Sequence, residues 1–324
     1  MPRMENCRQS EDELLMGLDI GGTKSALVLG RASGLVVARE EWASEAQRGP
    51  EAMLDDFCVH AKTLQECHGA ARAVGASIGG PLNAEEGIIL SPPNLPGWDK
   101  FPLLEHLRQR FALPVNVEHD AAACALAEYL WGNHAGAQRL IYLTCGTGFG
   151  SGIIIDGKPY YGAGGASPEI GHIAGAEDGP FAFGKTGSYE AFCSARSLGR
   201  IAAWKYPSRW PAPPQSSEID PLAFAGDPDA LEVVGTSANM TGRACALLAD
   251  LLRPDVILLG SLAIYLGQLW TDGVHASFRR HALPAACDAC HLGPHTLEDL
   301  QDKSSLAAAL SARADSRPAA LQQT

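Results

Sequence analysis

The chain has 324 residues, and this length suits two domains better than one core of ordinary size. With 46% hydrophobic and 19% charged residues, the composition is that of a folded globular protein and excludes a disordered one. The formal net charge of −12, without any cluster of Lys and Arg, argues against DNA or RNA as a partner.

No apolar run approaches the roughly 20 residues that cross a bilayer, so no membrane association is expected. The polar stretch 1–13 lacks the apolar core of a signal peptide, and we expect it to be a disordered tail. The sequence therefore predicts a cytoplasmic protein.

The first part of the chain predicts strands followed by a helix and a further strand. Apolar runs separated by glycine turns indicate an antiparallel meander over residues 14–38. Apolar residues at helical spacing cover residues 50–68, and a short buried strand at residues 73–78 ends in Gly79-Gly80-Pro81.

The remaining elements follow the same alternation. The pattern predicts helices at residues 101–111, 120–129, 229–252 and 304–313, and strands at 115–117, 140–143, 152–155 and 256–259. The Pro- and Ser-rich stretch 206–221 is expected to be loop, and residues 314–324 a second disordered tail.

The first candidate site is the loop Asp19-Ile-Gly21-Gly22-Thr23-Lys24. Glycines at a strand turn let backbone N–H groups approach an anion, and Thr23 and Lys24 add a hydroxyl and a cation. Asp19 could hold Mg²⁺ through water. A plain hairpin turn is the alternative, and the spacing is not that of a Walker A loop.

A second glycine loop follows at Gly146-Thr147-Gly148. A dinucleotide-binding loop should open a helix, whereas Ile153-Ile-Ile-Asp-Gly157 continues as a strand and hairpin. We therefore interpret this loop as a second phosphate clamp that faces the first.

Between these loops, Glu118-His119-Asp120 stands at a strand end and a helix start. Asp120 is either a helix N-cap or a carboxylate that accepts the proton of an attacking hydroxyl. Farther along, Glu169, His172 and Glu190 in a glycine-rich stretch suit a polyol ligand, which needs several hydrogen-bond partners around a ring.

The cysteines form one notable cluster, Cys287-Asp-Ala-Cys290-His291. It matches the pattern of covalent c-type haem attachment, but that chemistry belongs to exported proteins. We interpret the match as chance at a helix end, with a metal or redox role as the alternative.

The β-hairpin with a Gly/Thr-rich turn occurs twice and starts each half of the chain, which indicates a two-domain actin-like ATPase (ribonuclease H-like) α/β fold with an interdomain cleft. We expect an N-terminal domain at residues 14–130, joined by the helix 304–313, and a C-terminal domain at 131–303.

In this order, the motifs resemble the ROK family (repressors, open reading frames and kinases) over residues 16–310. The first loop, Cys145-Gly-Thr-Gly148 and Glu169-x-Gly-His172 resemble its phosphate and sugar motifs. The stretch Arg253-Pro-Asp-Val-Ile-Leu-Leu-Gly260 resembles the strand leading to its adenosine pocket, which adds Gly260 and Ser261.

The resemblance implies transfer of the γ-phosphate of ATP, with Mg²⁺, to a hexose hydroxyl, first of all O6 of glucose. Asp120 then takes the position of the catalytic base. The sugar side is implied to comprise Gly79, Gly80, Pro81, Asn94, His119, Asp120, Glu169, His172 and Glu190. The sequence leaves other hexoses and N-acetylhexosamines open, and it carries no interface signature for the homodimer that is common in the family.

Three departures from the family pattern stand out. The stretch Phe181-Ala-Phe-Gly-Lys-Thr-Gly-Ser188 lacks the cysteines of a common zinc site, so we expect no structural zinc, with Phe181 and Phe183 packing in its place. His119 replaces an Asn, which bears on sugar selectivity. Ser261-Leu262 replaces further glycines, which predicts a tighter nucleotide pocket.

Two rival functions remain at this level. A transcriptional repressor of the family would carry a winged helix before the first loop, and only about 13 residues precede Leu14. A non-catalytic sugar-binding protein is disfavoured because Asp19, Asp120, Glu169 and His172 are all present.

Overall fold

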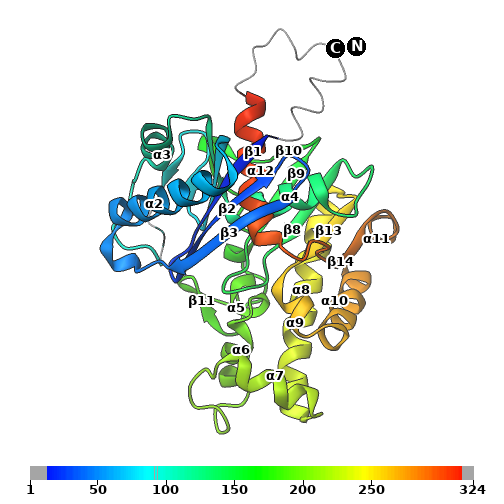
Figure 1. The fold of residues 1–324 in the computed structure, drawn as a ribbon. Coiled ribbons are helices and arrows are strands. Elements are labelled where there is room, and N and C mark those ends of the chain that lie inside the picture. The colour runs from blue at the N-terminus through cyan, green and yellow to red at the C-terminus, as the bar shows by residue number, and fades with distance from the viewer. Residues whose placement is uncertain (1–12, 91, 93, 316–324) are drawn as a thin grey trace. The chain divides into compact units, whose positions relative to one another are not determined.

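A computed structural model describes residues 13–90, 92 and 94–315 (Figure 1). Most of the two expected tails lies outside this range, although the last helix, α12, extends to Asp315. The described chain forms two compact units. The first comprises the described parts of residues 1–133, 158–167 and 297–324, and the second comprises 134–157 and 168–296.

The first unit is built on a five-stranded sheet in the order β3-β2-β1-β4-β7. Its strands are β1 (Leu14–Ile20), β2 (Lys24–Arg31), β3 (Val36–Ala43), β4 (Ala71–Ile78) and β7 (Val115–His119). The first three form the expected meander, since β1 pairs antiparallel with β2 and β2 with β3, whereas β4 runs parallel to both β1 and β7. Two short strands, β5 (Leu82–Asn83) and β6 (Ile88–Ile89), form a separate hairpin.

Both faces of this sheet are covered, because successive side chains of a strand point to opposite faces. Met16 packs in the cluster that contains α2 (Pro50–His68) and α3 (Leu103–Phe111). The adjacent Leu15 packs against α12 (Leu300–Asp315), which is red in Figure 1. Helix α4 (Asp120–Trp131) also contacts α12.

The second unit contains a sheet in the order β10-β9-β8-β13-β14. The strands from this unit are β8 (Arg139–Leu143), β9 (Ser151–Ile155), β13 (Val256–Leu259) and β14 (His291–Pro294), whereas the short edge strand β10 (Lys158–Pro159) belongs to the segment 158–167 of the first unit. Strands β8, β13 and β14 are parallel, and the hairpin partner β9 is antiparallel to β8. Beside them, β11 (Phe181–Ala182) and β12 (Lys185–Thr186) form a two-residue hairpin.

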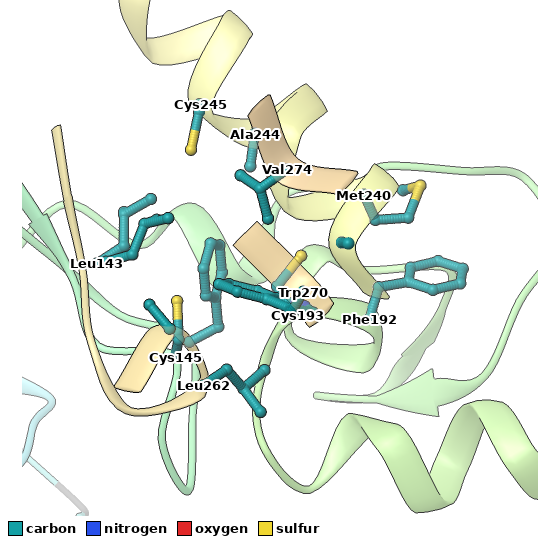
Figure 2. Close-up of a cluster of buried hydrophobic side chains, with 14 of the residues drawn as sticks. Leu143, Cys145, Phe192, Cys193, Met240, Ala244, Cys245, Leu262, Trp270 and Val274 are labelled. Carbon is teal, nitrogen blue, oxygen red and sulfur yellow. The ribbon is translucent and has the colours of Figure 1, made fainter. Parts of the chain in front are cut away.

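Seven α-helices belong to the described second unit. They are α5 (Tyr189–Cys193), α6 (Ser197–Lys205), α7 (Ser216–Phe224), α8 (Pro228–Leu252), α9 (Ser261–Tyr265), α10 (Gln268–His281) and α11 (Pro284–Ala289). Figure 2 shows their core, in which Trp270 of α10 lies among side chains from α5, α8, α9 and the end of β8. Trp270 is fully buried, and its indole N–H donates to Ser237 Oγ over 3.2 Å.

Two expectations about this unit need comment. The expected loop 206–221 is wrong at its end, because α7 begins at Ser216, where Gln215 and Glu218 form a reciprocal capping box. Cys287 lies in α11 and Cys290 follows it, and both are free thiols. Over the described residues, no group of three or more His, Cys, Asp or Glu side chains is arranged to hold a metal ion, and no helix is long and apolar enough to cross a membrane.

Candidate active site

The first glycine loop is the turn between β1 and β2, and Ser44 holds it in place. The Ser44 hydroxyl donates to Gly21 O over 2.6 Å, and the Ser44 amide donates to Thr23 O over 3.0 Å. The Ser44 hydroxyl also lies 2.8 Å from the hydroxyl of Ser25, and both serines are buried. Thr23 itself is exposed, so its hydroxyl and the turn amides are available to a ligand.

Gly22 brings this loop against a residue predicted for the sugar side. A Cβ atom at position 22 would lie 2.5 Å from the carbonyl oxygen of Asn94, well inside van der Waals contact. Only a residue without a side chain allows this approach. Two residues that are 72 positions apart and were predicted for different ligands are therefore neighbours in one unit.

Lys24 has a partner that the sequence did not predict. Its ammonium group lies 2.6 Å from Glu41 Oε1 on β3, and its side chain is 68% exposed. Arg39 pairs with the other oxygen of Glu41, and these two cations lower the pKa of that carboxyl to about 2. The positive charge of Lys24 is thus largely compensated, and the turn amides are the stronger candidates for contact with phosphate.

Asp19 is the most perturbed carboxylate of the first unit. Burial first, and then the nearby carboxylates of Asp120 and Asp302, raise its pKa to about 7, although Arg39 opposes them. A divalent cation would relieve this repulsion, and Mg²⁺ commonly uses only one or two carboxylates together with phosphate and water. The donor set around Asp19 therefore fits the expected magnesium ion.

Asp120 is the first residue of α4, directly after β7. Its Oδ1 accepts the adjacent amide of Ala121 over 2.6 Å, and the N-cap of the helix is His119, which makes no side-chain capping bond. The side chain is 45% exposed. A Cβ on Gly79 would lie 3.8 Å from Asp120 Oδ2, in ordinary contact. The N-cap interpretation is therefore wrong, and the carboxylate remains open to a ligand.

His119 lies between Asp120 and the Gly80-Pro81 turn. Its Nδ1 is 3.3 Å from Asp120 Oδ1, but this buried nitrogen makes no hydrogen bond in the described part of the chain. A Cβ on Gly80 would be 2.7 Å from the imidazole Cδ2, so glycine is needed there to leave room for the ring. Three residues predicted for the sugar side, Gly79, Gly80 and His119, thus lie next to Asp120 or next to its neighbour His119.

Tyr161 is a neighbour of this group that sequence reasoning missed. Its hydroxyl donates to Glu118 Oε2, and Asn116 Nδ2 donates to Glu118 Oε1 over 2.9 Å. Burial and then the charge of Glu118 raise the pKa of Tyr161 far above its ordinary value. Tyr161 lies in the segment 158–167, which returns to the first unit, and no local pattern announces that return.

In the second unit, the glycine loop 146–150 is closed by Thr144. The Thr144 hydroxyl donates to Gly148 O over 3.1 Å and accepts from the Gly150 amide over 2.9 Å. The Gly146 amide donates to Gly148 O over 3.0 Å. Thr147 at the tip is exposed. This loop is a structured turn that does not open a helix, which agrees with the rejection of a dinucleotide-binding motif.

Gly260 and Ser261 lie directly beside this loop. The Ser261 amide donates to Thr144 O over 3.2 Å, and a Cβ on Gly146 would lie 3.1 Å from Ser261 Oγ. The Gly260 amide donates to Leu143 O over 2.8 Å. The residues predicted for the nucleotide in this unit are therefore neighbours in the structure, although Gly260 is buried.

The predicted sugar residues of the second unit are held by different contacts. Glu169 accepts the amide of His172 through its carbonyl, over 3.1 Å, at the start of a short 3₁₀ turn. The His172 ring stacks on Phe183 with 5.4 Å between centroids and 18° between planes, and Lys185 Nζ donates to His172 O over 2.7 Å. Glu190 is 5% exposed, and burial raises its pKa.

The phenylalanines that replace the family's cysteines do not form a core. Phe181 and Phe183 are 65% and 51% exposed. The expected packing is wrong for Phe181, whereas Phe183 contacts His172 as a stacked ring on the surface.

Known proteins match this chain over nearly its full length. The protein-family model described as "ROK family" matches residues 15–313. A glucokinase of Halalkalibacterium halodurans is 30% identical in an alignment of 304 residues that covers 88% of this chain and 91% of that protein. A ROK hexokinase structure from Thermus thermophilus has a TM-score of 0.82 at 29% identity, covering 93% of this chain and 98% of that one.

Other matches show the range of activities among these relatives. A ROK family glucokinase from Streptomyces griseus, solved with glucose and AMPPNP, is 30% identical, with a TM-score of 0.76, and covers 93% of this chain and 99% of that one. An N-acetylmannosamine kinase of Escherichia coli is 32% identical over 78% of this chain and 85% of its own length. A xylose repressor of Caldicellulosiruptor bescii is 28% identical over 80% of this chain and 68% of its length. The matched structures confirm the expected two-domain α/β fold of the actin-like ATPases.

Proposed function

Because the chain belongs to the ROK family, we propose that it is an ATP-dependent sugar kinase that transfers the γ-phosphate of ATP to a hexose, with O6 of glucose as the first candidate acceptor. The observation that supports this most directly is Asp120. Its carboxylate is half exposed, accepts the neighbouring amide of Ala121, and stands beside Gly79, His119 and the buried Asp19. Such a group can accept a proton from a sugar hydroxyl as the hydroxyl attacks phosphorus.

Phosphoryl transfer depends more on positioning and charge neutralisation than on covalent chemistry. We assign the amides of the turn at Gly21-Gly22 and of the loop at Gly146-Gly148 to the phosphates of the nucleotide. Ser44 and Thr144 fix these two turns by hydrogen bonds to their backbones. Gly260 and Ser261 continue the second turn toward the nucleoside.

Mg²⁺ would be held near Asp19 together with phosphate oxygens, where it neutralises charge on the transferred group. An ionised Asp19 is needed for this role, and the cation favours ionisation of a carboxyl whose pKa is otherwise about 7.

Glucose is favoured over other sugars by the pair of glutamates and the histidine, Glu169, Glu190 and His172, together with the glucokinase relatives. The kinase relative that acts on N-acetylmannosamine makes that sugar the second candidate. His119, whose ring fills the space next to Gly80, is the residue that we expect to bear most on the choice.

The substitution Asp120→Asn tests the proposed base. We expect sugar binding to persist and the rate of phosphorylation to fall at least about 10²-fold, because general-base groups contribute on that scale. Sugar affinity is measured by titration calorimetry, and phosphorylation by ADP release coupled to NADH oxidation. A fully active Asp120→Asn enzyme would refute the assignment.

A panel of a dozen hexoses and N-acetylhexosamines, with the phosphorylated position determined by NMR, tests the substrate. Glucose is expected to give the highest kcat/KM, with product phosphorylated at O6. A chain that phosphorylates none of these sugars in the presence of ATP and Mg²⁺ would contradict the proposed function itself.

A further inference from the structure

The carboxylate of Glu190 lies against the second glycine loop. Its Oε2 accepts the backbone amide of Phe149, and a Cβ on Gly148 would be 3.4 Å from the same oxygen. Gly148 and Phe149 are the end of the loop that we assign to nucleotide phosphates. Glu190 therefore contributes to the shape of this loop as well as to the sugar side.

The other oxygen of Glu190 faces a cation. Arg200 of α6 places its Nη1 3.6 Å from Glu190 Oε1, and the carboxylate side chain is only 6% exposed, compared with 27% for the guanidinium. This Nη1 is buried and makes no hydrogen bond within the described residues. Since a guanidinium carries five donors and its charge is permanent, Arg200 can serve as the counter-ion of a buried glutamate.

The peptide between these two helices supports the same loop. The amide of Ala195 donates to Gly146 O over 2.7 Å, at the opposite end of the loop from Phe149. Buried Ser197 fixes this bend by donating to the carbonyl of Ser194 over 2.5 Å. The segment from α5 to α6 thus contacts the glycine loop at both ends. The Ala195 amide binds Gly146 at one end, and the Glu190 carboxylate binds Phe149 at the other.

We propose that Arg200 is a positioning residue of the kinase reaction, which keeps Glu190 ionised and thereby holds the second glycine loop in its phosphate-binding shape. This inference rests on the proposed function, because it concerns the loop given there to the nucleotide. Arg200 itself need not touch either ligand. It acts through Glu190, whose carboxylate accepts the Phe149 amide more strongly when ionised than when protonated.

The charges around Glu190 set the direction of the effect. Burial raises the pKa of Glu190, whereas the Phe149 amide, Arg200 and, more weakly, Arg196 lower it; Cys193 is a further titratable neighbour. Removal of Arg200 therefore raises the pKa of Glu190, and protonation then occurs at a higher pH. As the pH falls, the ionised form of Glu190, and with it the ordered loop, is then lost at a higher pH than in the wild type.

The test is Arg200→Met, followed by the pH profile of kcat/KM for ATP at saturating sugar. We expect the acid limb to move up by about one pH unit, since an opposite charge at this distance shifts a carboxyl by one to three units. Arg200→Lys keeps the charge and should restore most of the wild-type profile. In the Glu190→Gln background, Arg200→Met should produce no further shift. Lys205→Met removes another cation of α6, which pairs with Glu232, and should leave the profile unchanged.

A second readout does not depend on catalysis. Carboxyl ¹³C NMR, with the Glu190 signal assigned by its loss in Glu190→Gln, should show a higher pKa for this group in Arg200→Met than in the wild type. An unchanged titration would overturn the proposal for Arg200. If the wild-type chain phosphorylates no sugar, the proposed function fails, and this titration still decides whether Arg200 controls Glu190.

Discussion

At the scale of single residues, the environment of each carboxylate separates the acidic groups of the candidate site. Asp19 is buried near Asp120 and Asp302, Glu190 is buried beside a cation, and Asp120 is 45% exposed and accepts its neighbouring amide. A carboxylate that stays accessible suits contact with an attacking hydroxyl, whereas a buried one suits the ordering of a metal or a loop. Sequence spacing named all three residues but could not assign these differences.

The raised pKa of Asp19 predicts how stability depends on pH without ligands. The folded chain keeps the Asp19 proton up to about pH 7, whereas the unfolded chain releases it near its ordinary value of 3.8. The unfolded state therefore binds fewer protons in this window, and the free energy of unfolding falls as the pH rises from about 4 to 7. The stabilisation that comes from protonated Asp19 is complete below the pKa of the unfolded state, 3.8. It is lost as the pH rises through the pKa of the folded state, about 7.

Asp19→Asn should remove this loss. Thermal unfolding measured from pH 5 to pH 8 is expected to show a smaller decrease in Tm for the variant than for the wild type, while kinase activity is expected to fall because the carboxylate proposed to hold Mg²⁺ is gone. Asp272→Asn, at an exposed position of α10, is the matched control and should follow the wild type. Equal pH slopes for wild type and Asp19→Asn would contradict the burial argument.

At the scale of elements, the space around each glycine determines whether a larger residue can replace it. Helix α8 contains Gly235 and Gly242, which look alike in sequence. A Cβ on Gly235 would meet nothing within 4 Å, whereas one on Gly242 would lie 2.5 Å from the Cβ of Ser277 and 2.8 Å from the amide of Phe278 in α10. Gly242 therefore lets the two helices approach, and Gly235 does not serve that purpose.

The two glycines predict opposite effects of the same substitution. Gly235→Ala should stabilise the chain by about 0.5–1 kcal/mol, because alanine loses less backbone entropy in a helix. Gly242→Ala should destabilise it by about 1–3 kcal/mol through overpacking. Urea unfolding followed by circular dichroism measures both, and a destabilised Gly235→Ala or a stabilised Gly242→Ala would show that the helix contact is not as described.

Elements also account for the errors made from sequence. The stretch around residue 216 is rich in Pro and Ser, yet a capping box between Gln215 and Glu218 starts a helix there. From the sequence, Phe181 is expected to pack in place of a cysteine. In the structure it lies in a hairpin of two-residue strands, where its side chain is exposed. Local composition predicts the wrong structure in both cases. A capping contact decides the first and a hairpin turn decides the second, and composition encodes neither.

At the scale of the whole molecule, the net charge of −12 poses a problem for a protein that binds an anionic nucleotide. Within the first unit, the cation nearest the predicted phosphate turn, Lys24, is paired with Glu41. We therefore expect backbone amides and a divalent cation to supply most of the local attraction. This predicts that nucleotide affinity depends strongly on Mg²⁺.

Ligand binding should stabilise the molecule by mass action. A ligand at about 100 times its Kd adds about 2.7 kcal/mol to the free energy of unfolding. Differential scanning fluorimetry is expected to show a higher Tm with AMPPNP and Mg²⁺ than with AMPPNP and EDTA, and a higher Tm with glucose than with N-acetylmannosamine. If neither the nucleotide nor any sugar raised the Tm, the result would contradict both proposed binding sites.

The sequence by itself determined the repeated glycine hairpins, the strands and long helices and, through the order of the motifs, the family. These follow from local chemistry, since glycine turns and apolar periodicity are encoded within short windows. The tertiary structure alone brought Asn94 to Gly22, Ser44 to the first turn, Tyr161 to Glu118 and Arg200 to Glu190. Each of these contacts depends on how separate elements pack. Even where two partners are near in sequence, as Glu190 and Arg200 are, the sequence does not give the distance between their side chains.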